Sequence, residues 1–239
     1  MRYLKNYKIF ENHFGLTKTQ IDWLNFCTLG HWNVNSTNGL VDIDGSFHCA
    51  NQDIRDFKGI KFGKIKGSFN CSVNKITSLE GSPIEVGGDF YCHMNKLQNL
   101  IGGPKYVEGS FGCHDNQLTT LEGSPKKCFT LSCSRNLLEN LIGSPEEVYS
   151  IDFSENQIKS LEGISPQCVK IFCENNPIYF STLELIFNNM KSGNPYWISL
   201  ALLKNKIPKK DWDLLDKSGL TPDLEKGSST LKRFGIFGS

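Results

Sequence analysis

The stretch Gly109–Pro125, which reads G-S-F-G-C-H-D-N-Q-L-T-T-L-E-G-S-P, decides the fold because the chain contains seven copies of its pattern. An apolar residue opens each copy, a cysteine follows two places later (phenylalanine in the sixth copy), and an asparagine stands three places after that (glutamine in the first). Successive copies are 22, 21, 21, 20, 20 and 20 residues apart. A unit repeated at this period predicts a solenoid whose copies stack on one another. The opening residues are Phe47, Phe69, Phe90, Phe111, Leu131, Ile151 and Ile171.

Each copy predicts one short strand followed by an inward-turning amide. The F-x-C alternation places two apolar side chains on one face, as in a strand, and stacked copies then form a parallel sheet over a shared core. The asparagine, for example Asn116, can pair with backbone N–H and C=O groups of adjacent turns. The return segment L-E-G-S-P is too short for a full helix, so we expect it to be extended and irregular.

The change of period has a local cause. Four residues separate Ile65, Val86 and Val107 from the next phenylalanine, and each of these steps contains a glycine. Only three residues separate the corresponding Cys128 and Val148 from the next apolar residue, and the glycine is absent. We therefore expect a glycine-enabled bulge before the early strands that the later ones lack.

Nine cysteines would suit a disulfide framework, but their placement favours buried thiols. Six share one repeat position, which accepts Phe153 in the sixth copy, and Cys128 and Cys168 alternate with valine at another. Free cysteine behaves as a small hydrophobe, and burial lowers its reactivity. Reduced core thiols in a cytoplasmic protein are the simplest interpretation, with disulfides or a metal site as the alternative.

The pattern F/L-x-C-x-x-N-x-L-x-x-L-x-G-S-P resembles a leucine-rich repeat of the short bacterial type over residues 43–178. Similar cysteine-bearing copies are familiar from tailed-phage genomes and bacterial effector proteins. The resemblance implies a horseshoe with strands on its concave face, and a non-catalytic scaffold that binds another protein without cofactor or small-molecule substrate. By analogy, it also suggests a phage protein in the host cytoplasm that blocks a host or defence factor. The alternative is a structural component of a virion or assembly whose caps make the contacts.

The two ends are expected to cap the solenoid, because open ends expose core and unpaired strand edges. In residues 1–42 a helix follows Thr17, and a hairpin turns at Ser36–Gly39. In residues 179–239 helical spacing predicts helices around 183–187, 197–203 and 212–215, followed by a loose tail. This C-terminal region is either a cap or a separate binding or effector module.

Side chains that point away from the core along the strands form the candidate binding face. Its third and fourth copies carry a cluster rich in rings, and tyrosine is enriched at protein interfaces. A second candidate lies near the far end of the arc. The residues proposed to contact a partner are Asp89, Tyr91, His93, Met94, His114, Arg135, Asp152, Lys170, Phe172 and Glu174.

Other chemistries fit less well. Zinc at Asp89, His93 and His114 is disfavoured because side chains diverge from a flat strand face. The C-x-D spacing of Cys113–Asp115 matches a ubiquitin-ligase class, yet this cysteine faces the core and no catalytic domain of adequate size follows. No pocket-forming insertion interrupts the repeats, so we expect no enzyme. The net charge of +1 and the concave rows nearly free of Lys and Arg give no footprint for nucleic acid, and no apolar run or signal peptide predicts a membrane.

Overall fold

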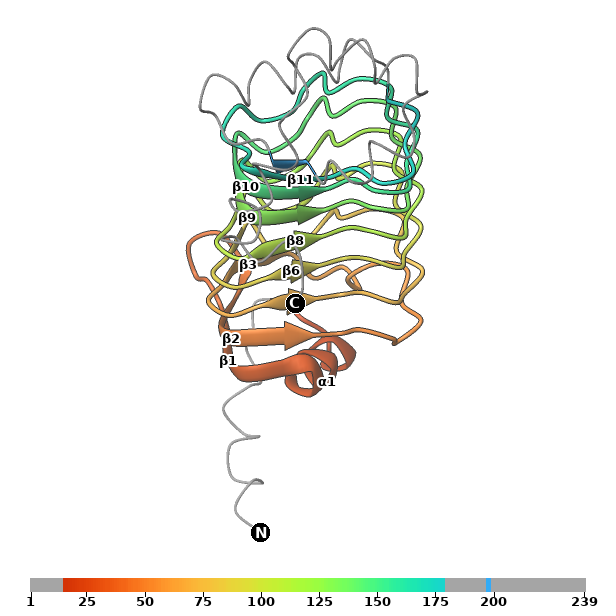
Figure 1. Cartoon of the computed structure of the whole chain (residues 1–239). Coiled ribbons are helices and arrows are strands. Elements are labelled where there is room, and N and C mark those ends of the chain that lie inside the picture. The colour runs from red at the N-terminus through yellow and green to blue at the C-terminus, as the bar shows by residue number, and fades with distance from the viewer. Residues whose placement is uncertain (1–14, 179–196, 199–239) are drawn as a thin grey trace, which may run out of the picture.

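The computed structural model describes residues 15–178 and 197–198, which form a stack of turns with their strands gathered along one side (Figure 1). Helix α1 and strand β1 lie at the N-terminal end, and each later turn lies above the one before it. The elements are α1 (Lys18–Cys27), β1 (Thr28–Val34), β2 (Val41–His48), β3 (Phe62–Ile65), β4 (Phe69–Asn70), β5 (Glu85–Val86), β6 (Phe90–Tyr91), β7 (Tyr106–Val107), β8 (Ser110–Gly112), β9 (Lys127–Ser132), β10 (Glu147–Asp152), β11 (Lys170–Phe172) and β12 (Trp197–Ile198).

The strands form one sheet that is parallel except at its first pair. Strand β1 pairs with β2 in antiparallel fashion, through a hairpin at the predicted turn. The seven residues that open the copies then meet in sequence, from Phe47 beside Phe69 to Ile151 beside Ile171. This register confirms the predicted repeat, and the parallel β-solenoid agrees with a leucine-rich-repeat-like fold.

The core is a set of columns that run along the stack. Phe47, Phe69, Phe90 and Phe111 stack ring on ring, with centroids 5.2, 5.4 and 5.1 Å apart. This spacing follows from the distance of about 4.8 Å between neighbouring strands. All four rings are fully buried. A single turn could not bury such a face, so each turn is stabilised chiefly by its two neighbours.

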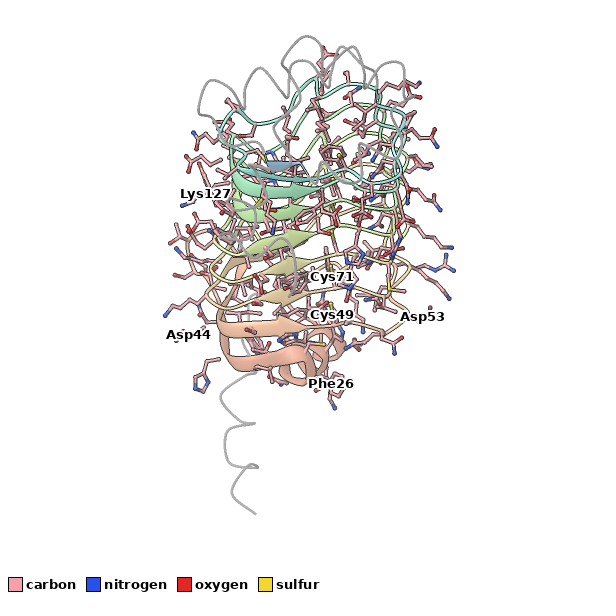
Figure 2. The ribbon with its side chains drawn as sticks, in the orientation of Figure 1. Phe26, Asp44, Cys49, Asp53, Cys71 and Lys127 are labelled. Carbon is pink, nitrogen blue, oxygen red and sulfur yellow. The ribbon has the colours of Figure 1, made fainter. Side chains whose placement is uncertain are left out.

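The nine cysteines are free and buried, which confirms the predicted place of their side chains in the core. Figure 2 shows Cys49 and Cys71 on successive turns inside the stack, while Asp44 and Lys127 point outward. Burial raises the pKa of Cys168 to about 11 and that of Cys128 to about 12. Because the thiolate is the nucleophile, these side chains are chemically quiet at neutral pH.

The asparagines form a hydrogen-bonded column, as predicted. Asn116 Nδ2 donates to the carbonyl oxygens of Cys113 in its own turn (3.0 Å) and Cys92 in the preceding turn (3.1 Å). Its Oδ1 accepts from the N–H of Leu97 at 3.0 Å. Each amide therefore pairs a backbone N–H that the dry interior would otherwise leave unsatisfied. The two carbonyl oxygens each accept from two successive asparagines, since Cys92 also accepts from Asn95 and Cys113 from Asn136. The same arrangement is repeated at Asn74, Asn95, Asn136, Asn156 and Asn176.

Gln52 takes the asparagine position in the first copy because it faces helix α1 instead of another turn. Its Oε1 accepts from Trp23 Nε1 at 2.7 Å, and its Nε2 lies 3.2 Å from Cys27 Sγ. Trp23 also packs edge-on against Phe47, with centroids 5.2 Å apart. The longer side chain thus joins the helix to the first turn. Helix α1 begins after Thr17, as predicted, and Thr17 forms a capping box with Gln20.

The predicted interruption of the early strands is present. In the early turns the strand is divided into two short pieces, namely β3 and β4, β5 and β6, and β7 and β8. In the later turns β9 and β10 are each one continuous strand. At each break a side chain of one turn accepts from the backbone of the next: Ser110 N–H, for example, donates to Asp89 Oδ1 at 2.7 Å. A Cβ on Gly109 would lie 2.3 Å from that same oxygen. The glycine is therefore required for close approach between turns.

The residue before each column asparagine is left-handed. Six consecutive turns show this, with φ between 52° and 56°, and Val73 (φ 56°) is the β-branched member. The left-handed region is strained for most L-residues and most of all for β-branched ones, whereas asparagine tolerates it. The six residues are Val73, Met94, Asp115, Arg135, Glu155 and Asn175.

Replacing Val73 with asparagine is expected to stabilise the fold by about 1 kcal/mol, or roughly 2–4 °C in Tm. Little packing is lost, because Val73 is 38% exposed. Val73→Thr is the control: it adds a polar atom but keeps the β-branch, so it should give no comparable gain. Thermal unfolding followed by circular dichroism measures both, and equal Tm values for the two variants would contradict the backbone explanation.

At the C-terminal end one prediction is wrong. Trp197 and Ile198, expected in a helix, form β12 and pair in parallel with Lys170 and Ile171 of β11. The open edge of β11 offers unpaired N–H and C=O groups, which a further strand satisfies and a helix would not. The helices expected around 183–187 and 212–215 and the tail lie outside the described residues. The domain division at residues 42/43 and 178/179 stays a prediction, as does the capping role of the two ends.

Candidate functional site

The predicted binding face is the outward side of the strands, called the strand face below. Its middle row is in the predicted register, since Tyr91 lies beside Gly112 and Asp152 beside Phe172. The face is not open throughout, because Ser72 and Ser150 are only 3% and 6% exposed. Both belong to the rows of outward side chains, so the prediction that these rows face solvent is wrong at these two positions.

The structure brings together the first predicted cluster. The Tyr91 hydroxyl donates to Asp89 Oδ2 at 3.0 Å, and the Tyr91 ring meets His93 edge-on with centroids 5.8 Å apart. His93 and His114 stack on adjacent turns at 4.3 Å, with their planes 10° apart. Met94 stands beside them, half exposed. The result is a continuous ring-lined surface across two turns.

Gly112 makes room for this cluster. A Cβ at this position would lie 2.9 Å from Tyr91 Cδ1 and 3.7 Å from His93 Nδ1, so the Tyr91 ring lies over a gap in the row. The absence of a side chain in the neighbouring turn is the sequence signal that marks this place. It was visible in the row of outward residues but its role was not predicted.

The electrostatics of the cluster differ between the two histidines. Burial, and then the neighbouring His114, lower the pKa of His93, so its ring is neutral at pH 7. His93 Nδ1 is buried without a hydrogen-bond partner. His114 Nδ1 lies 2.7 Å from Asp115 Oδ2. A neutral, partly desolvated imidazole beside a paired one suits contact with a partner more than proton transfer.

A chain of charges continues from this cluster. Arg135 Nη1 lies 3.4 Å from Asp115 Oδ2, and Arg135 Nε lies 3.2 Å from Glu155 Oε1. Arg135 was a predicted site residue, whereas Asp115 and Glu155 were not. The two carboxylates hold the guanidinium across three turns, which reduces the conformational freedom that a partner contact would have to remove.

The second predicted patch is also assembled, near the end of the stack. Lys170 Nζ lies 4.7 Å from the centroid of the Phe172 ring, within the range of a cation–π contact. Asp152 stands beside Phe172 in the sheet, and its Oδ1 accepts from the Ser154 N–H at 3.0 Å. Glu174 follows on the same turn, where its N–H donates to Ser154 Oγ. The patch is smaller than the first cluster and 36% of Phe172 is exposed.

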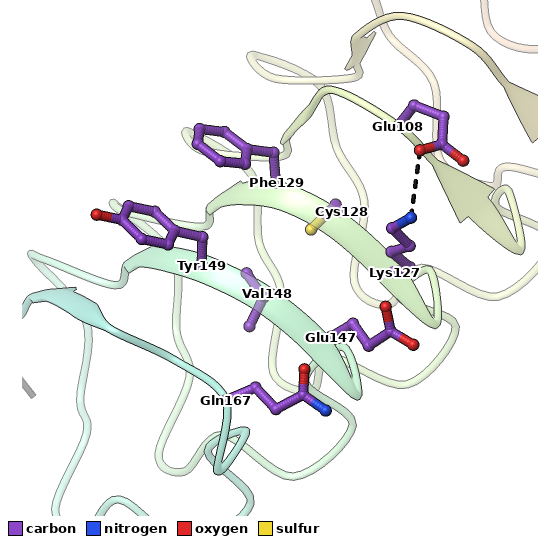
Figure 3. A pocket seen from close by; sticks show the side chains of 8 residues that line it. All are labelled: Glu108, Lys127, Cys128, Phe129, Glu147, Val148, Tyr149 and Gln167. Carbon is purple, nitrogen blue, oxygen red and sulfur yellow. Dashed lines mark hydrogen bonds and ion pairs between the residues drawn. The ribbon is translucent and has the colours of Figure 1, made fainter. Parts of the chain in front are cut away.

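Sequence reasoning missed a second kind of surface on β9 and β10. Phe129 and Tyr149 stack in parallel at 5.2 Å, with their planes 2° apart, and are 59% and 47% exposed. They form one side of a hollow of about 280 Å³ (Figure 3). The sequence does contain a signal for this surface. Both aromatic residues lie between two core positions of their turn, at the place where the early turns have the glycine-containing break.

Two further properties concern the described residues. Within residues 15–178 and 197–198, no three His, Cys, Asp or Glu side chains are arranged to hold a metal ion. In the same part of the chain, no helix combines the length and hydrophobicity needed to cross a bilayer.

Comparison with known proteins gives a match of low similarity only. No protein-family model and no curated protein matches the chain. Among solved structures the chain is similar to YopM from Yersinia enterocolitica WA-314, with 17% identity and a TM-score of 0.29. The match covers 55% of this chain and 38% of the YopM chain, so the chain spans well under half the length of that protein. The functional argument therefore depends on the surfaces described above.

Proposed function

We propose that this chain is a non-catalytic scaffold of the leucine-rich-repeat type that binds another protein through its strand face. The observation that carries the proposal is the cluster of Tyr91, His93 and His114, which presents ring surface continuous across two turns. The core is made by a different set of residues, so the fold does not need these rings. Tyrosine anchors of this kind, set among polar neighbours, are typical of protein interfaces.

The rigidity of the surface supports the same proposal. Each side chain of the cluster stands on a strand or on the turn that ends it, and the asparagine column joins that turn to the next. A preorganised surface loses little conformational entropy on binding. The finer form of the proposal is a phage protein in the host cytoplasm that binds or inhibits a host defence protein.

Alanine at both Tyr91 and His114 is expected to reduce partner capture by tenfold or more, because such anchors are worth about 2 kcal/mol each or more. Thermal stability should stay close to that of the wild type. Affinity purification of the tagged chain from its native cells, with quantitative mass spectrometry, measures the capture. The matched control is Tyr106→Ala with His31→Ala, which removes the same residue types from exposed sites off the cluster. Equal partner recovery by the two double variants would refute the proposed surface.

The alternative is a structural component of a virion or assembly, with contacts at the ends of the stack. Its support is the N-terminal end, where Phe26 and Leu29 are 80% and 64% exposed. Phe26→Glu with Leu29→Lys distinguishes the two. Loss of incorporation into particles by this variant, with unchanged incorporation by the Tyr91 and His114 variant, would favour the assembly role.

A further inference from the structure

The stacked pair of Phe129 and Tyr149 is a surface that the fold does not require. The inward positions of β9 and β10 are filled by Cys128 and Val148, which are 2% and 4% exposed. The two aromatics alternate with them and point to the outside. The two rings are 59% and 47% exposed, and exposed apolar surface of this kind marks interaction sites.

The hollow beside the rings has a polar wall. Figure 3 shows Phe129 and Tyr149 on one side, Cys128 and Val148 between, and the polar side chains on the other. Its volume of about 280 Å³ is just below the range of roughly 300–1,000 Å³ that small-molecule sites occupy. It has room for one long side chain. The polar wall consists of Glu108, Lys127, Glu147 and Gln167.

The net charge of this polar wall favours a positively charged side chain in the hollow. Lys127 Nζ is engaged by Glu108 Oε2 at 3.3 Å. Glu147 has no ion pair among the described residues. Two carboxylates against one ammonium leave one negative charge in excess. An anion is therefore repelled, and a purely apolar side chain would desolvate Glu147 without compensation.

We propose that this hollow binds an arginine side chain of the protein partner. The methylene stem lies against Phe129 and Tyr149, and the guanidinium donates to Glu147, with the Gln167 side-chain oxygen as a second acceptor. Arginine fits better than lysine because its head group is less strongly hydrated and presents several donors in a fixed fork, which can serve Glu147 and Gln167 together. The inference rests on the proposed protein-binding function and adds a second contact to it.

The hollow lies where the broken strands of the early turns meet the continuous strands of the later ones. β9 pairs with the broken strands β7 and β8 on one side and with the continuous β10 on the other. The N–H of Phe129 donates to the carbonyl oxygen of Gly109, which lies in the break of the preceding turn. Phe129 therefore occupies, in the continuous strand β9, the place that the glycine-containing break has in the turn before it. Glu108 lies in this break, between β7 and β8, and pairs with Lys127 of β9.

A random linear peptide library selected on the wild-type chain tests the inference. Enriched peptides are expected to share an arginine, and replacing it with norleucine should weaken binding about fivefold or more. Glu147→Gln should weaken binding two- to fivefold, as expected for an exposed ion pair. Glu146→Gln removes the same charge one residue away and should leave binding unchanged. Phe129→Ala with Tyr149→Ala should lose tenfold or more without a change in Tm, since both rings are exposed.

Three results would overturn the inference: no enriched peptide, enriched peptides without a shared arginine, or peptides still held by the Phe129 and Tyr149 variant. The Tyr91→Ala/His114→Ala variant separates this test from that of the proposed function. Peptides lost only in that variant would refute the arginine site and leave the strand-face function standing. Partner recovery unaffected by that variant in native cells would refute the strand-face function instead.

Discussion

Gly123→Ala is expected to destabilise the protein by about 2–5 kcal/mol, because it combines backbone strain with a clash between turns. Gly123 has φ +91°, a conformation that costs an L-residue about 1–2 kcal/mol. An added Cβ would also lie 2.2 Å from the carbonyl carbon of Leu100 in the preceding turn. Because that atom is backbone, whole turns must shift apart, and overpacking of this kind costs a further 1–3 kcal/mol.

The chain offers a control that separates the two causes. Gly39 has a similar φ of +72°, but an added Cβ there would meet nothing within 4 Å. Gly39→Ala should therefore show only the backbone strain, about 1 kcal/mol. Denaturant unfolding measures both free energies. Equal losses in the two variants would show that close approach between turns contributes nothing at Gly123.

Asn116→Ala is expected to cost about 3 kcal/mol, because it leaves three backbone groups with one partner fewer. The N–H of Leu97 loses its acceptor, and the carbonyl oxygens of Cys92 and Cys113 each lose one donor and keep a second, from Asn95 and Asn136. A buried group left unsatisfied costs about 1–3 kcal/mol. For a chain of this size the change corresponds to a fall in Tm of roughly 6–12 °C.

Asn140→Ala is the matched control for this loss. Its side chain also accepts one backbone hydrogen bond, from Ile142 N–H at 3.0 Å, but in an exposed segment where water replaces it. We expect a change of less than 1 kcal/mol. Differential scanning calorimetry measures the Tm of both variants. A fall in Tm for Asn116→Ala no greater than that for Asn140→Ala would show that the asparagine column does not stabilise the fold.

The repeat made most of the fold predictable from sequence. Phe111, Cys113 and Asn116 each recur at one position, and a residue type that recurs at a fixed period must meet the same environment in every turn. The strand register, the buried thiols, the asparagine column and the break before the early strands follow from that constraint. The clustering of Tyr91, His93 and His114 followed too, because register places their positions side by side.

What occurs once could not be predicted in this way. β12 is separated from β11 by a segment of different length, so the period gives no guide to Trp197. Gly112 acts through an absent side chain, and the Phe129–Tyr149 hollow depends on where broken strands meet continuous ones. These features come from the relation between neighbouring turns. The sequence of a single repeat therefore cannot predict them.

The column of cysteines also makes the order in which the turns unfold measurable by thiol labelling. From Cys49 to Cys173, every repeat except the sixth carries a thiol at the same buried position. Each is shielded from alkylating reagents until its own turn detaches from its neighbours. The sequence in which the sulfur atoms are labelled under mild denaturation therefore reports from which end the solenoid frays, turn by turn and without any engineered probe.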